Sequence, residues 1–81
     1  KAARHVDMRW FSVSPGSALA DQTLAASRLR SRTGVSVVAL VREGALIGNP
    51  GPEDVICAGD RVAVIGSPEQ LPAAEALLSE Q

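Results

Sequence analysis

Hydrophobic and polar positions divide the chain into short extended segments separated by turns. Residues 61–66, RVAVIG, alternate as a half-buried strand does. Residues 35–42 are apolar except for Ser36 and the final arginine, which predicts a strand with no solvated face. Residues 8–14, MRWFSVS, and 45–49, ALIGN, favour two further strands. A hairpin turn at Glu43-Gly44 is expected to join the middle two strands.

The first helical stretch follows Pro15-Gly16, the turn that ends the first strand. Residues 17–27 favour a helix, with Ser17 as its N-cap and Asp21 near its first turn. The polar stretch 28–33, RLRSRT, is then expected to be a connection to the next strand.

A second helix is predicted near the C-terminus. Ser67 is the expected N-cap, Pro68 occupies the first position and Gln70 completes a capping box. Pro72 is expected to interrupt the first turn, so that the regular helix restarts there and runs to about Ser79. The apolar positions that share one helix face are Leu71, Ala74 and Leu78.

The order of elements predicts an α+β domain. It consists of a mostly antiparallel sheet of four to five strands with two helices packed on it. Residues 50–60 hold two prolines and two glycines and form a loop, with an extended piece around Val55-Ile56. We expect residues 1–9 to be a lead-in linker or the start of the first strand, and residues 10–81 to form the domain.

Composition adds an expectation about assembly. Trp10 and Phe11 are the only aromatic residues among 81, so the core must be built from aliphatic side chains that bury little area each. Dimerisation would add the missing burial. The first residue is Lys1 rather than methionine, and we expect an excised domain.

Charge and cysteine content exclude several classes of protein. The net charge of −1 argues against a nucleic-acid binder, because phosphate contacts require clustered positive charge. Seven of the eight basic residues nevertheless lie in residues 1–42, which weakly indicates an anion-facing side. The single Cys57 excludes an internal disulfide, no Cys/His cluster could hold zinc, and a reducing cytoplasm is expected. We find neither a signal peptide nor an apolar run long enough to span a membrane.

Catalysis is not expected. The single histidine, His5, lies in the lead-in, and Ser67 is committed to a helix cap. No glycine-rich phosphate loop of Rossmann or P-loop spacing occurs. We therefore predict a domain that is not an enzyme and needs no metal or cofactor.

The order of motifs resembles one known family. The first strand leads to SPGSALADQTL (14–24), then to LRSRTGVSVVALVREG (29–44), and then to NPGPEDVICAGDRVAVIGSPEQL (49–71) and a closing helix. From about Trp10 to Leu78 the chain resembles the C-terminal ligand-binding domain of regulators of potassium conductance, called RCK_C or TrkA-C. The lead-in HVDMRWFSV (5–13) is most similar to KhtT-type regulatory subunits of bacterial cation:proton antiporters.

The resemblance implies a cytoplasmic homodimeric sensor that controls a potassium transporter or antiporter, and that lies at the inner membrane through this partner. Family members bind cyclic di-AMP in the cleft between two protomers. In the family's binding pattern, Leu24 takes the first aliphatic position, Arg30 the arginine, and Val37-Val38 the closing aliphatics. The chain departs from the pattern where Arg28 replaces an acid and Ser36 replaces an asparagine.

The chemistry of such a ligand fits these residue types. A cyclic dinucleotide has two phosphates and two adenines related by approximate two-fold symmetry, which a symmetric dimer matches. Arg30 supplies a bidentate donor for a phosphate, and Ser36 can bond a ribose or a base edge. The expected apolar wall for adenine consists of Leu24, Val37, Val38, Leu40 and Pro50, with Asn49 as a further contact.

Other interpretations stay open at this point. Arg28, Arg32 and Arg42 are expected to be solvated surface residues, and Asp60 to cap the turn before its strand. The chain could instead be a purely structural dimerisation and assembly module. It could also sense a different ligand, either another nucleotide or a cation.

Overall fold

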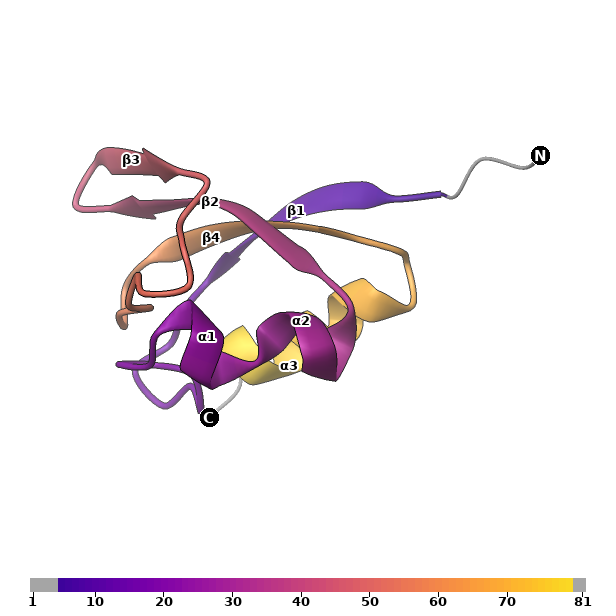
Figure 1. Cartoon of the computed structure of the whole chain (residues 1–81), viewed down its shortest axis with the longest axis horizontal. Coiled ribbons are helices and arrows are strands. Elements are labelled where there is room, and N and C mark those ends of the chain that lie inside the picture. The colour runs from indigo at the N-terminus through magenta and orange to yellow at the C-terminus, as the bar shows by residue number, and fades with distance from the viewer. Residues whose placement is uncertain (1–4, 80–81) are drawn as a thin grey trace.

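Four antiparallel strands form one sheet, and the helices all lie on the same side of it (Figure 1). This computed structural model describes residues 5–79. The strand order across the sheet is β1-β4-β2-β3. The α+β class and the antiparallel sheet are therefore confirmed. The elements are β1 Asp7–Ser12, α1 Leu24–Ser27, α2 Leu29–Thr33, β2 Ser36–Arg42, β3 Ala45–Gly48, β4 Arg61–Gly66 and α3 Gln70–Ser79.

Two local signals act as the sequence predicts. Glu43 and Gly44 join β2 to β3 with φ of 52° and 82°, and two successive positive φ angles match the twist of a tight hairpin. At the start of α3, the Ser67 N–H donates to Gln70 Oε1 (2.8 Å) and the Gln70 N–H donates to Ser67 Oγ (3.2 Å). This reciprocal pair is the predicted capping box.

The prediction that Pro72 interrupts the last helix is wrong. Helix α3 runs unbroken from Gln70 to Ser79 with Pro72 inside its first turn. The first four N–H groups of a helix have no partner within the helix, so a proline this early removes little. Leu71, Ala74 and Leu78 are buried on one face, as predicted.

The predicted helix over residues 17–27 is also wrong, because most of that segment consists of turns. Helix α1 covers only four residues, and its N-cap is Thr23, whose Oγ1 accepts from the Ala26 N–H at 3.0 Å. Asp21 adopts a left-handed φ of 71°, which breaks the helix before it starts. Ser17 instead donates from its hydroxyl to the Leu77 carbonyl (2.6 Å) and ties this segment to α3.

The expected connection at residues 28–33 forms helix α2 instead. Arg28 separates α1 from α2 with a left-handed φ of 52°, and Gly34 ends α2 with φ of 89°. Gly34 packs against the side chain of Gln70, so the end of α2 lies on the start of α3. This contact positions the segment that carries Arg30.

We expect Gly34→Ala to destabilise the domain by about 1–3 kcal/mol. An alanine at positive φ costs about 1–2 kcal/mol, and its Cβ would lie 2.4 Å from Gln70 Nε2. Gly44→Ala is the matched control, since its φ of 82° is similar but no heavy atom lies within 4 Å of the added Cβ. Urea denaturation measures both variants; equal losses would show that the Gln70 contact contributes nothing.

The core lies between the sheet and the helices. A β-bulge at Val38 shifts the register of β2 against β4, so that Val37 pairs with Val64 and Leu40 with Val62 on the helix side. Both partners on β4 are fully buried. The buried cluster comprises Phe11, Val13, Leu19, Leu29, Val35, Leu40, Ile56, Val62, Val64, Leu71, Ala74 and Leu78.

The opposite face of the sheet carries no helix (Figure 1). The strand register places Trp10, Ala63, Ala39 and Gly48 in one row across this face. Trp10 is 39% exposed and Leu46 on β3 is 67% exposed. Every residue of β2 is buried or partly buried, and the exposed large hydrophobic side chains of this face belong to β1 and β3. We call this surface the outer sheet face.

Candidate ligand-binding site

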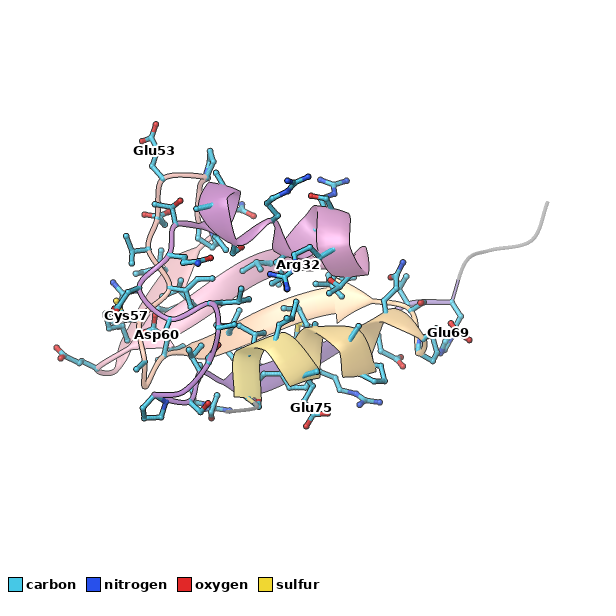
Figure 2. All side chains as sticks on the ribbon, turned by 90° about the horizontal axis from the view of Figure 1, so that it is seen from below. Arg32, Glu53, Cys57, Asp60, Glu69 and Glu75 are labelled. Carbon is cyan, nitrogen blue, oxygen red and sulfur yellow. The ribbon has the colours of Figure 1, made fainter. Side chains whose placement is uncertain are left out.

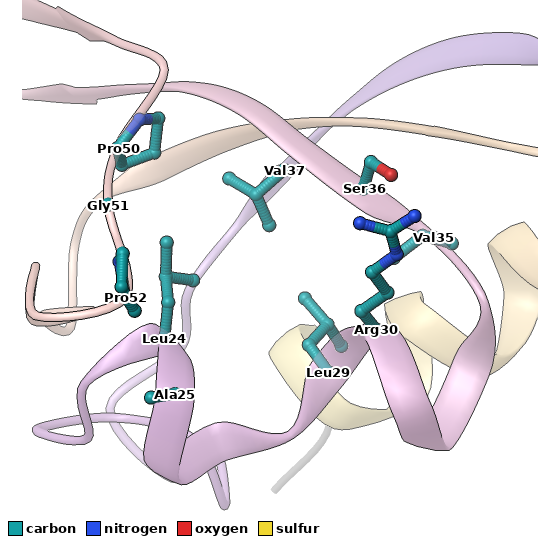
Figure 3. A pocket seen from close by; sticks show the side chains of 10 residues that line it. All are labelled: Leu24, Ala25, Leu29, Arg30, Val35, Ser36, Val37, Pro50, Gly51 and Pro52. Atoms are coloured by element: carbon teal, nitrogen blue, oxygen red, sulfur yellow. The ribbon is translucent and has the colours of Figure 1, made fainter.

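A pocket of about 300 Å³ lies on the helix side of β2 (Figure 3). The first half of β2 forms its upper edge, and helices α1 and α2 form its lower edge. The loop after β3 closes one end with Pro50 and Pro52. Its volume is at the lower limit of ligand pockets, which run from about 300 to 1,000 Å³.

Backbone pairing builds the apolar end of the pocket. The N–H of Leu24 donates to the Asp54 carbonyl (2.9 Å), and the N–H of Ala25 donates to the Pro52 carbonyl (3.0 Å). These two N–H groups belong to the first turn of α1, where a helix has no internal acceptors. The loop therefore caps α1, and the two segments form one wall, which we call the α1–loop wall (residues 21–25 and 50–56).

Arg30 and Ser36 form the polar end of the pocket. Both side chains lie at the end opposite Pro50 and Pro52, and the Arg30 guanidinium extends toward Ser36 (Figure 3). Arg30 is exposed. The ion pairs found within residues 5–79 are His5–Asp7 and Arg42–Asp60, so no carboxylate of that part of the chain neutralises Arg30. An anion entering the pocket would meet an available guanidinium.

Five of the eight predicted contact residues line this pocket. They are Leu24, Arg30, Ser36, Val37 and Pro50. The prediction that Leu40 contacts the ligand is wrong, because Leu40 is 1% exposed and packs in the core. Val38 and Asn49 lie outside the lining; Val38 is the bulge residue, and its carbonyl accepts from the Asn49 N–H at 2.9 Å.

The sequence interpretation missed five lining residues. Leu29 and Val35 are buried and form the floor, while Ala25, Gly51 and Pro52 belong to the α1–loop wall. Helix α2 places Leu29 and Arg30 side by side, and this helix was expected to be a connection. Only the apolar position between Arg28 and Arg30 signalled that the segment has a buried side.

Arg42 is not the solvated residue that the sequence predicted. Its Nε donates to Asp60 Oδ1 (2.9 Å), and its Nη2 donates to Asp60 Oδ2 (2.8 Å) and to the Val55 carbonyl (2.7 Å). Asp60 is 1% exposed and also accepts from the Cys57 N–H at 2.8 Å, so its predicted role as a turn cap is confirmed. Cys57 and Asp60 lie beside each other at one end of the molecule (Figure 2).

This ion pair has clear electrostatic consequences. The hydrogen bonds from Arg42 hold the pKa of the Asp60 carboxyl below its usual range, with a smaller contribution from the Cys57 N–H. The same hydrogen bonds raise the pKa of Arg42. Both groups are therefore ionised at neutral pH.

The remaining polar groups offer little other chemistry. No cluster of three or more His, Cys, Asp or Glu side chains that could hold a metal occurs in the described part of the chain. None of the helices there is long and apolar enough to cross a membrane. His5 contacts Asp7 at 3.6 Å on the exposed surface before and within β1.

Comparison with known proteins identifies the family. The sequence profile of the TrkA-C domain matches residues 8–79, which is most of the chain. The chain belongs to the TrkA-C domain family. The match begins within β1 and ends at the last residue of α3, so the pocket and the outer sheet face are both parts of this TrkA-C domain.

One curated relative is a channel protein. The "Probable potassium channel protein 2" of Methanocaldococcus jannaschii is 29% identical over 76 residues, which is 94% of this chain. The TrkA-C domain described here spans only 22% of that relative's length.

Solved structures share the fold of this TrkA-C domain. The RCK_C domain dimer of S. agalactiae BusR in complex with c-di-AMP superposes with a TM-score of 0.84 at 24% identity, over 91% of this chain and 97% of that one. BusR in complex with its busAB-promotor DNA has a TM-score of 0.82 at 25% identity, over 88% and 35%. The RCK C domain of the potassium transport protein KtrA in complex with c-di-AMP has a TM-score of 0.78 at 21% identity, over 86% and 80%.

Proposed function

We propose that this TrkA-C domain binds cyclic di-AMP at a homodimer interface and thereby regulates a potassium transport protein. The single observation that carries the proposal is the pocket itself, in which an unneutralised arginine faces an aliphatic wall. Arg30 provides the bidentate donor for a phosphate, and Leu24, Val37 and Pro50 provide the apolar surface for an adenine. The similar BusR and KtrA domains in complex with c-di-AMP support the same ligand.

The size of the pocket supports a shared site. A volume of about 300 Å³ on one protomer is small for a ligand of two nucleotides. Two pockets related by a two-fold axis offer two arginines for two phosphates and two walls for two adenines. Occupancy then favours one arrangement of the two protomers over others, which is how binding at this site reaches a membrane partner.

The finer assignments rest on the sequence. A KhtT-type antiporter subunit follows from the resemblance of residues 5–13. A position on the cytoplasmic side of the inner membrane follows from the resemblance of the whole domain to its family. The charge balance of the chain argues that the domain does not bind nucleic acid. The position of the single histidine in the lead-in and the use of Ser67 as a helix cap favour a regulator over an enzyme. This domain matches only 35% of the BusR chain in the DNA complex. That complex therefore leaves open the prediction that this domain does not bind nucleic acid.

A second candidate function is supported by the outer sheet face. Met8, Trp10 and Leu46 are exposed large hydrophobic residues on this one surface, and the Arg61 guanidinium lies 5.2 Å above the centre of the Trp10 ring. Exposed apolar patches of this kind mark interfaces. In this alternative the domain is an assembly module, and a second copy covers the outer sheet face without any ligand.

Calorimetric titration with cyclic di-AMP, combined with sedimentation, separates the two functions. We expect micromolar or tighter binding, one dinucleotide per dimer, and a higher unfolding temperature at saturation, because the ligand binds only the folded state. Binding of one ligand per monomer would contradict a shared site. No binding, with an unchanged dimer, would favour the assembly module.

A further inference from the structure

Arg42 lies outside the pocket but is bonded to the loop that forms one of its walls. Its guanidinium holds the Val55 carbonyl at 2.7 Å while it holds both oxygens of Asp60. Asp60 in turn accepts from the Cys57 N–H. Residues 55 and 57 are therefore fixed to the end of β2 and to the residue before β4 by the paired side chains of Arg42 and Asp60.

We propose that Arg42 is a positioning residue for the ligand site, acting through the α1–loop wall. This inference rests on the proposed function. Arg42 is absent from the residues that line the pocket, so it does not touch the ligand. It fixes one end of the loop whose other end, Pro50 to Pro52, lines the pocket.

Continuous backbone pairing connects the two ends of the wall. Asp21 N–H donates to the Ile56 carbonyl (2.6 Å), and Ile56 N–H donates to the Gln22 carbonyl (2.7 Å). Thr23 pairs with Val55, and the bonds from Leu24 to Asp54 and from Ala25 to Pro52 follow. A shift of Val55 is therefore transmitted along this ladder to Leu24, which faces the pocket.

The planar fork of arginine is needed for this role. The Nη2 atom bonds Asp60 and the Val55 carbonyl together, while Nε bonds the second carboxylate oxygen. The ammonium of a lysine can neutralise the buried Asp60, but it is a compact charge that cannot reproduce this planar arrangement. Arg42→Lys therefore keeps a positive charge beside the buried Asp60 but removes the bonds that position the loop. Its effect on binding then reports the positioning and not the burial of an unpaired carboxylate.

The test compares Arg42→Lys with the unaltered protein at a temperature where both are folded. We expect Arg42→Lys to bind cyclic di-AMP about tenfold more weakly, which corresponds to one lost hydrogen bond to a charged group. Amide hydrogen exchange at Leu24 and Ala25 should become faster. Ligand should slow exchange at the hydrogen-bonded amides of Ile56 and Cys57, outside the pocket, in the unaltered protein but much less in the variant.

Arg9→Lys is the matched control, because Arg9 is exposed on β1 and forms no side-chain hydrogen bond or ion pair within residues 5–79. It should leave affinity and exchange unchanged. Equal affinities of Arg42→Lys and the unaltered protein would overturn the positioning role and leave the proposed function standing. Weaker binding with unchanged exchange at Leu24 and Ala25 would also overturn it. No binding by the unaltered protein would overturn the proposed function and this inference together.

Discussion

Replacing Arg30 with alanine is expected to weaken cyclic di-AMP binding by about 100-fold or more. Two hydrogen bonds from a guanidinium to a phosphate contribute about 1.5–3 kcal/mol each, and tenfold in affinity corresponds to 1.4 kcal/mol. Arg30 is exposed and forms no ion pair within residues 5–79, so its removal should leave folding nearly unchanged. Calorimetric titration of the folded variant measures the loss.

Arg32→Ala is the control for this prediction. Arg32 lies on the same short helix and is also exposed, but it does not line the pocket. Arg32 adds the same positive charge to the surface as Arg30 does. An equal loss of affinity for cyclic di-AMP in both variants would therefore indicate general attraction of an anion instead of a phosphate contact at Arg30. Binding that is unaffected by Arg30→Ala would contradict the proposed site. Dimerisation should persist in both variants.

The features that the sequence predicted correctly are encoded by neighbouring residues. Ser67 and Gln70 are three positions apart and bond each other, and Glu43-Gly44 needs only its own φ angles to reverse the chain. Residues 61–66 likewise form β4, although Val62, Ala63 and Val64 are all buried, so this strand has no regular exposed side. Each of these signals is complete within one turn or one strand.

The errors arise where distant residues pair. The helix expected over residues 17–27 loses its backbone donors to carbonyls of Pro52, Asp54 and Ile56, about 30 residues away. Arg42 and Asp60 are 18 residues apart, and neither residue by itself indicates the other. Local propensity contains no information about these contacts, so tertiary pairing overrides it.

In the candidate site, too, some residues were predicted from the sequence and others were missed because they depend on pairing between distant segments. Arg30 and Val37 were expected because they fit the family's binding pattern, and Pro50 because an apolar wall for an adenine was expected; all three line the pocket. Leu40 was wrongly included because it lies on the same side of β2 as Val37 but is buried in the core, and residue type by itself does not separate a core position from a pocket position. Leu29 and Pro52 were missed because they belong to a helix and a loop whose positions depend on pairing between segments.

Arg42→Met is expected to destabilise the domain by about 3–5 kcal/mol at pH 7. The variant removes the partner of Asp60, which is 1% exposed, and a buried carboxylate without a counter-charge is strongly unfavourable. The bond to the Val55 carbonyl is lost as well, but this carbonyl lies at an exposed residue where water can replace it. Denaturant unfolding at pH 7 measures the change. A loss below 1 kcal/mol would show that the pair behaves as an ordinary surface ion pair.

The dependence of stability on pH should reverse sign in the same variant. In the unaltered protein the pKa of Asp60 is lower in the folded state than in the unfolded state. The contribution of Asp60 to the free energy of unfolding is therefore complete above the unfolded pKa of about 3.9, and it is lost as pH falls through the folded pKa. In Arg42→Met, burial without a partner raises the folded pKa of Asp60 above the unfolded one. The loss of stability caused by the ionised, unpaired Asp60 is then complete above that raised pKa. It is relieved as pH falls and Asp60 takes up a proton. Stability of Arg42→Met relative to Arg42→Met/Asp60→Asn should therefore increase between pH 7 and pH 4, and a constant difference would show that Asp60 escapes to solvent when its partner is removed.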